Sequence, residues 1–175
     1  MGAMIFTVKN FLLFGVLIIA MITDIRSNRI PNWLTLPAII TGLCFNFISA
    51  GAGGFLFGVE GLLLGVGLFI VLYIIGGMGA GDVKLMGAVG AMLGPQMVLW
   101  AAFYTALAGG IYALAVIVFH PRARVIRVAL METIKGFIYS RSLKYSRPVN
   151  GENPPKLCYG VAIAIGTIAA VILKM

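Results

Sequence analysis

The chain has 175 residues, of which 61% are apolar and only 10% are charged, and its mean hydropathy is +1.07. Ordinary globular chains are about 45–50% apolar and about 25% charged, so this chain has too few polar residues to cover a surface that faces water. These values exclude a disordered chain, a nucleic-acid-binding module, a secreted disulfide scaffold and a soluble enzyme. They predict a membrane protein that crosses the bilayer several times.

Apolar segments of membrane-spanning character follow one another along most of the chain. A bilayer core about 30 Å thick needs about 20 helical residues, and Gly94-Pro95 divides the long apolar stretch 85–119. We interpret the first segment as a retained helix, because no small-residue cleavage site follows it. The predicted fold is all-α with six transmembrane helices at about 5–23, 34–50, 55–77, 82–93, 96–119 and 157–173, which together form a single membrane-embedded domain.

The basic residues predict the orientation of these helices. Of the 13 Lys and Arg residues, all but Lys9 and Lys174 fall in segments 24–33, 78–84 and 120–156. The positive-inside rule places these segments in the cytoplasm and both termini outside. A five-span arrangement would put the most basic segment, 120–156, on the outside.

An amphipathic helix is predicted within the basic segment 120–156. Residues 122–144 carry an apolar stripe on one helical face and basic residues on another. Such a helix lies on the membrane surface, here on the anionic inner leaflet. The lipid bilayer is therefore one predicted partner of the chain, and nucleic acid is not.

The chain has only five acidic residues: Asp24, Glu60, Asp82, Glu132 and Glu152. The last two lie in the basic cytoplasmic segment, where solvation or ion pairing accounts for them, and Glu60 is either interfacial or paired with Lys9. The two aspartates differ, because each stands at the cytoplasmic end of a predicted helix. The predicted topology can bring them face to face.

A purely structural role for the two aspartates remains open at this stage. Asp82 follows a glycine turn and opens a helix, where aspartate is a favoured N-cap. Asp24 ends a helix, where a carboxylate opposes the helix dipole by about 0.3–1 kcal/mol. Pairing with Arg26 or Arg29 would offset that cost.

The surroundings of Asp82 favour a chemical role. A helix over 82–93 rises only about 18 Å, so the glycine-rich turn 76–81 is expected to enter at membrane depth and to line a cavity. Ionisable groups at that depth are functional candidates. Two adjacent carboxyls share one proton, so one can take a proton from water while the other polarises a scissile carbonyl. Glycine flanks let an extended substrate backbone come close.

Three segments resemble one known family. Gly79-Ala80-Gly81-Asp82-Val83-Lys84 resembles the G-x-G-D-x-K motif of type IV prepilin peptidases. Segment 24–32, which runs from Asp24 to Ile30-Pro31-Asn32, resembles the other aspartate region of that family. Segment 159–164, which begins Tyr159-Gly160, resembles the short members that serve tight-adherence (Flp-type) pili. Cys158 replaces their usual proline, and we expect this departure to lie far from the aspartates.

The resemblance implies an aspartic endopeptidase that removes the basic leader of a membrane-bound prepilin at the cytoplasmic face of the cell membrane. It implies Asp24 and Asp82 as catalytic residues and Gly79 and Gly81 as part of the active-site loop. The pilus assembly machinery is a further candidate partner, and no metal or organic cofactor is expected. Larger members also methylate the new N-terminus and carry paired C-x-x-C motifs, which this sequence lacks; we therefore predict no methyltransferase activity.

Other interpretations stay open beside this one. Lys84 either contacts a substrate carboxylate or serves as a cationic anchor or as a partner for an aspartate. A proton-coupled transporter subunit would use Asp24 and Asp82 as relay carboxyls. A non-enzymatic assembly partner of a pilus machine would need neither aspartate. The presenilin group shares GxGD, but its second aspartate typically follows tyrosine, whereas Thr23 precedes Asp24 here.

Overall fold

The computed structural model describes residues 2–75, 77–119 and 158–174. The chain divides into two units, one formed by Met1–Gly109 with Cys158–Met175 and the other by Gly110–Leu157. Of the second unit, the structure describes only the final turns of one helix. The predicted amphipathic helix at 122–144, together with Glu132 and Glu152, lies outside the described residues.

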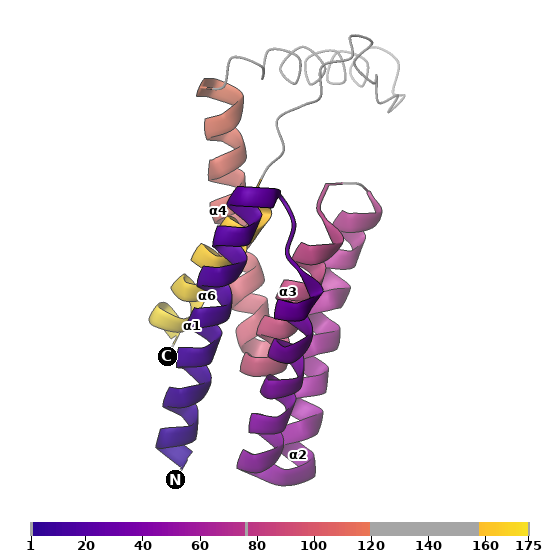
Figure 1. Ribbon diagram of the computed structural model, residues 1–175, viewed down its shortest axis with the longest axis vertical. Helices are drawn as coiled ribbons and strands as arrows, with labels where there is room; N and C mark the ends of the chain where they lie inside the picture. Colours follow the sequence, from indigo (N-terminus) through magenta and orange to yellow (C-terminus); the bar gives the residue numbers. More distant parts are fainter. Residues whose placement is uncertain (1, 76, 120–157, 175) are drawn as a thin grey trace. The chain divides into compact units, whose positions relative to one another are not determined.

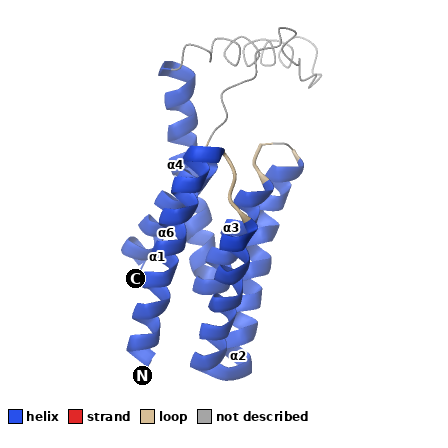
Figure 2. Cartoon of the chain, in the orientation of Figure 1, coloured by secondary structure: helices blue, strands red, loops and turns tan. Residues whose placement is uncertain are grey.

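The described residues form helices, without a strand among them (Figures 1 and 2). The all-α prediction is therefore confirmed for this part of the chain. The helices begin and end within a few residues of the predicted spans. Their bounds are Gly2–Ser27 for α1, Asn32–Ile74 for α2, Ala80–Leu93 for α3, Pro95–Phe119 for α4 and Tyr159–Lys174 for α6.

Helix α2 consists of two helical arms that fold back on each other. The backbone leaves the helical conformation at Ala50 and at Gly51, where φ is +59°, a value that glycine adopts without steric cost. Figure 1 shows the two arms of α2 side by side, and the rings of Phe47 and Phe55 pack edge to face across the turn with centroids 6.5 Å apart. The two arms correspond to the predicted segments 34–50 and 55–77.

Helix α3 is the most buried element of the first unit. Eleven of its 14 residues are buried, including an unbroken run from Leu85 to Leu93. A helix that is apolar all round is typical of an interior position, and its largest interface is with α2. In a 14-residue helix the backbone rises about 21 Å.

Glycines on α2 let its second arm approach the backbone of α3. A Cβ atom added at Gly61 would collide with the backbone of Gly90, and one added at Gly65 would lie 2.5 Å from the carbonyl oxygen of Met86. Small residues allow this close approach where lipid provides little hydrophobic drive for association. Gly61 and Gly65 thus serve the packing of α2 against α3.

Helices α1 and α6 pack against each other in opposite directions. In Figure 1, α1 runs upward from the N-terminus, and α6 runs downward beside it to the C-terminus. Leu13, Leu17 and Ala20 form the buried stripe of α1 at helical spacing. The start of α6 therefore lies beside the end of α1, where Asp24 is located.

Three described helical segments are long and apolar enough to cross a membrane: Val8–Ser27, Asn32–Ile74 and Pro95–Val116. The apolar stretch Tyr159–Leu173 is shorter. Large apolar side chains point outward from these helices, as in Phe11, which is 80% exposed, and Ile48, which is 68% exposed. Such a surface is expected to face lipid rather than water.

Candidate active site

Asp24 lies one turn before the end of α1 and is only 5% exposed. Its Oδ2 accepts a hydrogen bond of 2.8 Å from the backbone N–H of Gly160, the second residue of α6. The first four N–H groups of a helix have no partner within that helix, and the helix dipole favours negative charge at this end. Helix α6 therefore supplies the donor that holds this carboxylate, while the nearby Arg26 and Arg29 are exposed.

The contact between α1 and α6 requires glycine at position 160. A Cβ atom there would lie 2.9 Å from Oδ2, 3.0 Å from Cβ and 3.1 Å from Cγ of Asp24. Distances this short mean that any larger residue must push the carboxyl group away.

Asp82 lies at the opposite kind of helix end, in the first turn of α3, and is 7% exposed. Its Oδ2 accepts a hydrogen bond of 3.0 Å from the backbone N–H of Gly79. The N-cap of α3 is Gly79, and Asp82 is the third helical residue. The interpretation of Asp82 as an N-cap is therefore wrong in position, because its carboxylate reaches back to the N–H of the capping residue.

The turn between α1 and α2 joins the two aspartate regions. Asn28 directly follows α1 and has a left-handed φ of 50°, which asparagine tolerates better than most residues. This reversal places the buried Ile30 against the glycine turn that precedes Asp82. A Cβ atom at Gly81 would lie 3.0 Å from the Cβ of Ile30 and 3.2 Å from its backbone nitrogen.

A single polar cavity of about 310 Å³ contains all the residues that the sequence singled out for chemistry. Asp24, Asp82, Gly79, Gly81 and Lys84 all line it, and the turn between α1 and α2 contributes Asn28, Arg29, Ile30 and Asn32. The two carboxylates are close enough to interact electrostatically. The two aspartates, which lie far apart in the sequence, are therefore brought together in the structure.

Lys84 lies at the exposed rim of this cavity. Its Nζ donates a hydrogen bond of 2.9 Å to Oδ1 of Asn32, the first residue of α2. This bond leaves the other two ammonium donors able to face the cavity.

Two residues at the site, Cys158 and Gly160, could not be recognised from the sequence around the aspartates. Gly160 was noted only for its resemblance to short family members, and Cys158 was expected to lie far from the aspartates. That expectation is wrong, because the Sγ of Cys158 lies 4.0 Å from the main-chain oxygen of Asp24 and 3.7 Å from Oδ1 of Asn28. The antiparallel packing of α1 and α6 brings the start of α6 to the end of α1, and nothing in the local sequence around Asp24 signals it.

The remaining described acidic residue, Glu60, lies away from the cavity and is exposed. Lys9, its suggested partner, donates a hydrogen bond of 3.4 Å to Oδ1 of Asn46. Within the described ranges, no cluster of three or more His, Cys, Asp or Glu residues has the arrangement of a metal site.

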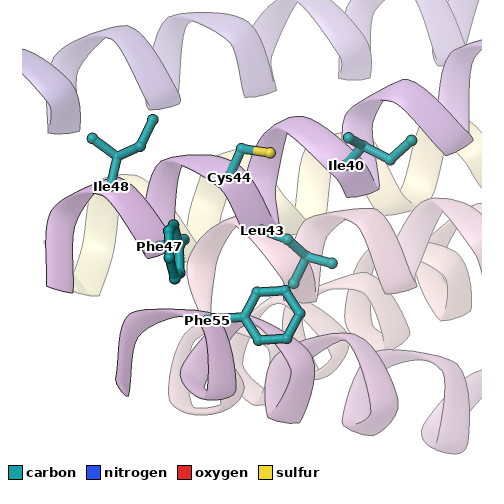
Figure 3. Close-up of a pocket in the computed structure, with 6 residues that line it drawn as sticks. All are labelled: Ile40, Leu43, Cys44, Phe47, Ile48 and Phe55. Carbon is teal, nitrogen blue, oxygen red and sulfur yellow. The ribbon is translucent and has the colours of Figure 1, made fainter. Parts of the chain in front are cut away.

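A second cavity lies along α2 and has a different character (Figure 3). It has a volume of about 540 Å³ and is lined by side chains from both arms of α2: Ile40, Leu43, Cys44, Phe47, Ile48 and Phe55. These side chains are apolar apart from one thiol, and they lie toward the break at Gly51 rather than toward Asn32. This cavity lacks the groups needed for acid–base chemistry.

Comparison with known proteins places this sequence in a family. A model of the type IV leader peptidase family matches residues 11–114, a range that contains both aspartates and ends before α6. A protein from Burkholderia pseudomallei named prepilin leader peptidase/N-methyltransferase is 38% identical over 96 residues, which cover 49% of this chain and 31% of that protein. One of the same name from Bacillus subtilis is 30% identical over 106 residues, covering 59% of this chain and 42% of the relative.

A third relative with that name, from Aeromonas salmonicida, is 30% identical over 121 residues, covering 63% of this chain and 40% of the relative. The chain thus spans less than half the length of each of these relatives. No solved structure gives a significant match. Because the family model covers more than half of the chain and includes both aspartate regions, this chain belongs to the type IV leader peptidase family.

Proposed function

We propose that this chain is a membrane-embedded aspartic endopeptidase that removes the basic leader from type IV prepilins of the Flp-like kind. Asp24 and Asp82 are the catalytic residues of this proposal. The observation that carries it is the single polar cavity that both aspartates line, together with the glycine turn before α3. Family membership supports the same reaction class.

The hydrogen bonds of the two carboxylates suit a shared-proton mechanism. Each uses Oδ2 to accept one backbone N–H, and its Oδ1 has no hydrogen-bond partner among the described residues. Two nearby carboxyls hold one proton between them at low cost. The ionised carboxyl then takes a proton from water, which attacks the scissile carbonyl carbon. The protonated carboxyl polarises the carbonyl oxygen and later helps to protonate the leaving amine.

The proposal places the site at the cytoplasmic side of a six-span protein in the inner membrane, with both termini outside. Support comes from the shortness of α3, whose rise of about 21 Å is less than a bilayer core of about 30 Å. The cavity end of α3 would then be recessed and sheltered by protein, where irregular backbone is tolerated. Arg29 and Lys84 at the cavity rim fit the positive-inside rule.

We propose peptidase activity without N-methylation, although the curated relatives carry both activities in their names. Neither Cys44 nor Cys158 belongs to a C-x-x-C pair, and neither forms a disulfide bond. The membrane-bound prepilin and the anionic inner leaflet are the proposed partners, with the pilus assembly machinery beyond them. Mass spectrometry of the mature pilin N-terminus would detect a methyl group if this part of the proposal is wrong.

Coexpression with a candidate Flp-type prepilin tests the reaction itself. We expect Asp24→Asn and Asp82→Asn each to lower the rate of leader removal by about 10³-fold, within the range typical of lost acid–base catalysis. The exposed acidic residue Glu60 offers a matched control, and Glu60→Gln should cleave like the wild type. A gel shift of the prepilin reports cleavage, and immunoblotting checks that all variants reach the membrane.

Two outcomes would contradict the proposal. Continued cleavage by either asparagine variant would remove the two-aspartate mechanism. Failure of the wild type to cleave any of several prepilins, combined with pH-driven flux through the protein, would favour a proton-coupled transporter instead.

A further inference from the structure

The contact between α6 and Asp24 has a consequence for the reaction. We propose that Gly160 is a positioning residue of the active site, whose backbone N–H orients the Asp24 carboxyl and whose missing side chain lets that carboxyl reach it. This inference rests on the proposed function of the aspartate pair. It assigns a role to a segment that lies outside residues 11–114, the range matched by the family model.

The geometry ties the orientation of Asp24 to this one donor. The N–H of Gly160 donates to Oδ2 of Asp24 at 2.8 Å, and the bond is buried. Because one carboxylate oxygen is fixed, the direction of the other oxygen is fixed as well, in a residue that lines the cavity. Hydrogen bonds from a helix N-terminus to a carboxylate are charge-assisted and therefore strong.

The steric requirement is separate from the hydrogen bond. An alanine at position 160 would keep the N–H, yet its Cβ would lie within 3.1 Å of three atoms of Asp24. Alanine is a better helix former than glycine, so α6 itself should tolerate the change. Any loss of activity would then come from displacement of the Asp24 carboxyl.

Kinetics provide the first test. We expect Gly160→Ala to lower kcat by about 10- to 100-fold with KM within about twofold, because small misplacements of reacting groups cost this much. Gly15→Ala is the matched control, because Gly15 lies on the same helix as Asp24 and a Cβ there would meet nothing within 4 Å. Circular dichroism and gel filtration in detergent check that both variants fold. A Gly160→Ala variant with wild-type kcat would overturn the proposal.

Spectroscopy provides a second test that does not depend on catalysis. Tyr159-Gly160 is the only Tyr-Gly pair in the sequence. Labelling the full chain with carbonyl-¹³C tyrosine and ¹⁵N glycine therefore selects a single backbone amide, that of Gly160. We expect its proton shift to change over the pH range in which carboxyl groups titrate, and this change to disappear in Asp24→Asn.

Other charged groups face the same place and need a control. Asp82 on α3 and Tyr159 on α6 interact electrostatically across the site, and Arg29 and Lys84 line the cavity. In Asp82→Asn, the Gly160 signal should still titrate, with an altered midpoint. A titration that survives in Asp24→Asn, or one that is lost in Asp82→Asn, would show that Gly160 does not report on Asp24 and would overturn the inference. Either result is independent of whether any prepilin is cleaved.

Discussion

Each of the two aspartates accepts one hydrogen bond from a backbone N–H of a glycine, but the two donors lie at very different distances along the sequence. Asp82 accepts the N–H of Gly79, three residues earlier, whereas Asp24 accepts the N–H of Gly160, 136 residues later. The difference follows from helix ends. The free backbone groups at the start of a helix are N–H donors, and those at its end are carbonyl acceptors. A carboxylate in the first turn of α3 finds a donor locally, but one near the end of α1 must obtain it from another helix.

This contrast predicts that the two aspartates are sensitive to substitutions at different packing contacts. The position of Asp82 depends on the α2 glycines that pack against the backbone of α3. The position of Asp24 depends on the contact between the start of α6 and the end of α1. The turn between α1 and α2 joins the two regions through the contact of Ile30 with Gly81. Substitutions in these three places separate their contributions.

The largest effect is expected from Gly61→Ala, which disturbs the packing of α3, the helix that carries Asp82. The added Cβ would meet the backbone of Gly90 and of Gly94, and backbone atoms cannot rotate away. Overpacking of this kind costs about 1–3 kcal/mol of stability, and displacement of α3 should abolish cleavage. Thermal unfolding in detergent measures the loss of stability, and the prepilin gel shift measures the loss of cleavage.

Gly67→Ala on the same arm of α2 provides the comparison, because its Cβ would meet nothing within 4 Å. We expect that variant to unfold and cleave like the wild type. Equal stability of Gly61→Ala and Gly67→Ala would show that the Asp82 region does not depend on this packing.

A smaller effect is expected from Gly81→Ala, which acts where the two regions meet. Its Cβ would press on Ile30 at 3.0 Å and on the adjacent backbone at 3.2 Å, so the turn between α1 and α2 must shift by a few tenths of an ångström. We expect kcat to fall about tenfold, with little change in the unfolding temperature. Gly77→Ala, in the connection that precedes α3, has its nearest contact at an ordinary 3.4 Å and should leave kcat unchanged.

The smallest effect is expected from Lys84→Ala at the rim of the cavity. Its side chain is exposed, and its bond to Asn32 links the starts of α3 and α2. If Lys84 contacts a carboxylate of the substrate, KM should rise by a few-fold with kcat unchanged, since an exposed ion pair contributes about 0.2–1 kcal/mol. Steady-state kinetics with a purified prepilin separates the two parameters. Normal processing of all substrates by this variant would remove the proposed substrate contact.

Much of the helical framework could be predicted from the sequence, because hydropathy and turn signals act locally. Gly94-Pro95 predicted the break between α3 and α4. The glycine turn before Asp82 was also recognisable, because the donor and the acceptor of its hydrogen bond lie three residues apart. The prediction failed for Cys158, which was expected to lie far from the aspartates and instead contacts both Asp24 and Asn28.

The sequence by itself determined the helices, their apolar character and the chemical identity of the two carboxyl groups. Only the tertiary structure decided that α6 returns to the end of α1 and places the N–H of Gly160 on Asp24. The physical reason is that helix formation and hydropathy depend on neighbouring residues, whereas the donor for a carboxylate at a helix end has to come from a different helix. The packing of antiparallel helices determines which donor that is, and here it depends on a position where any side chain would displace the carboxyl group.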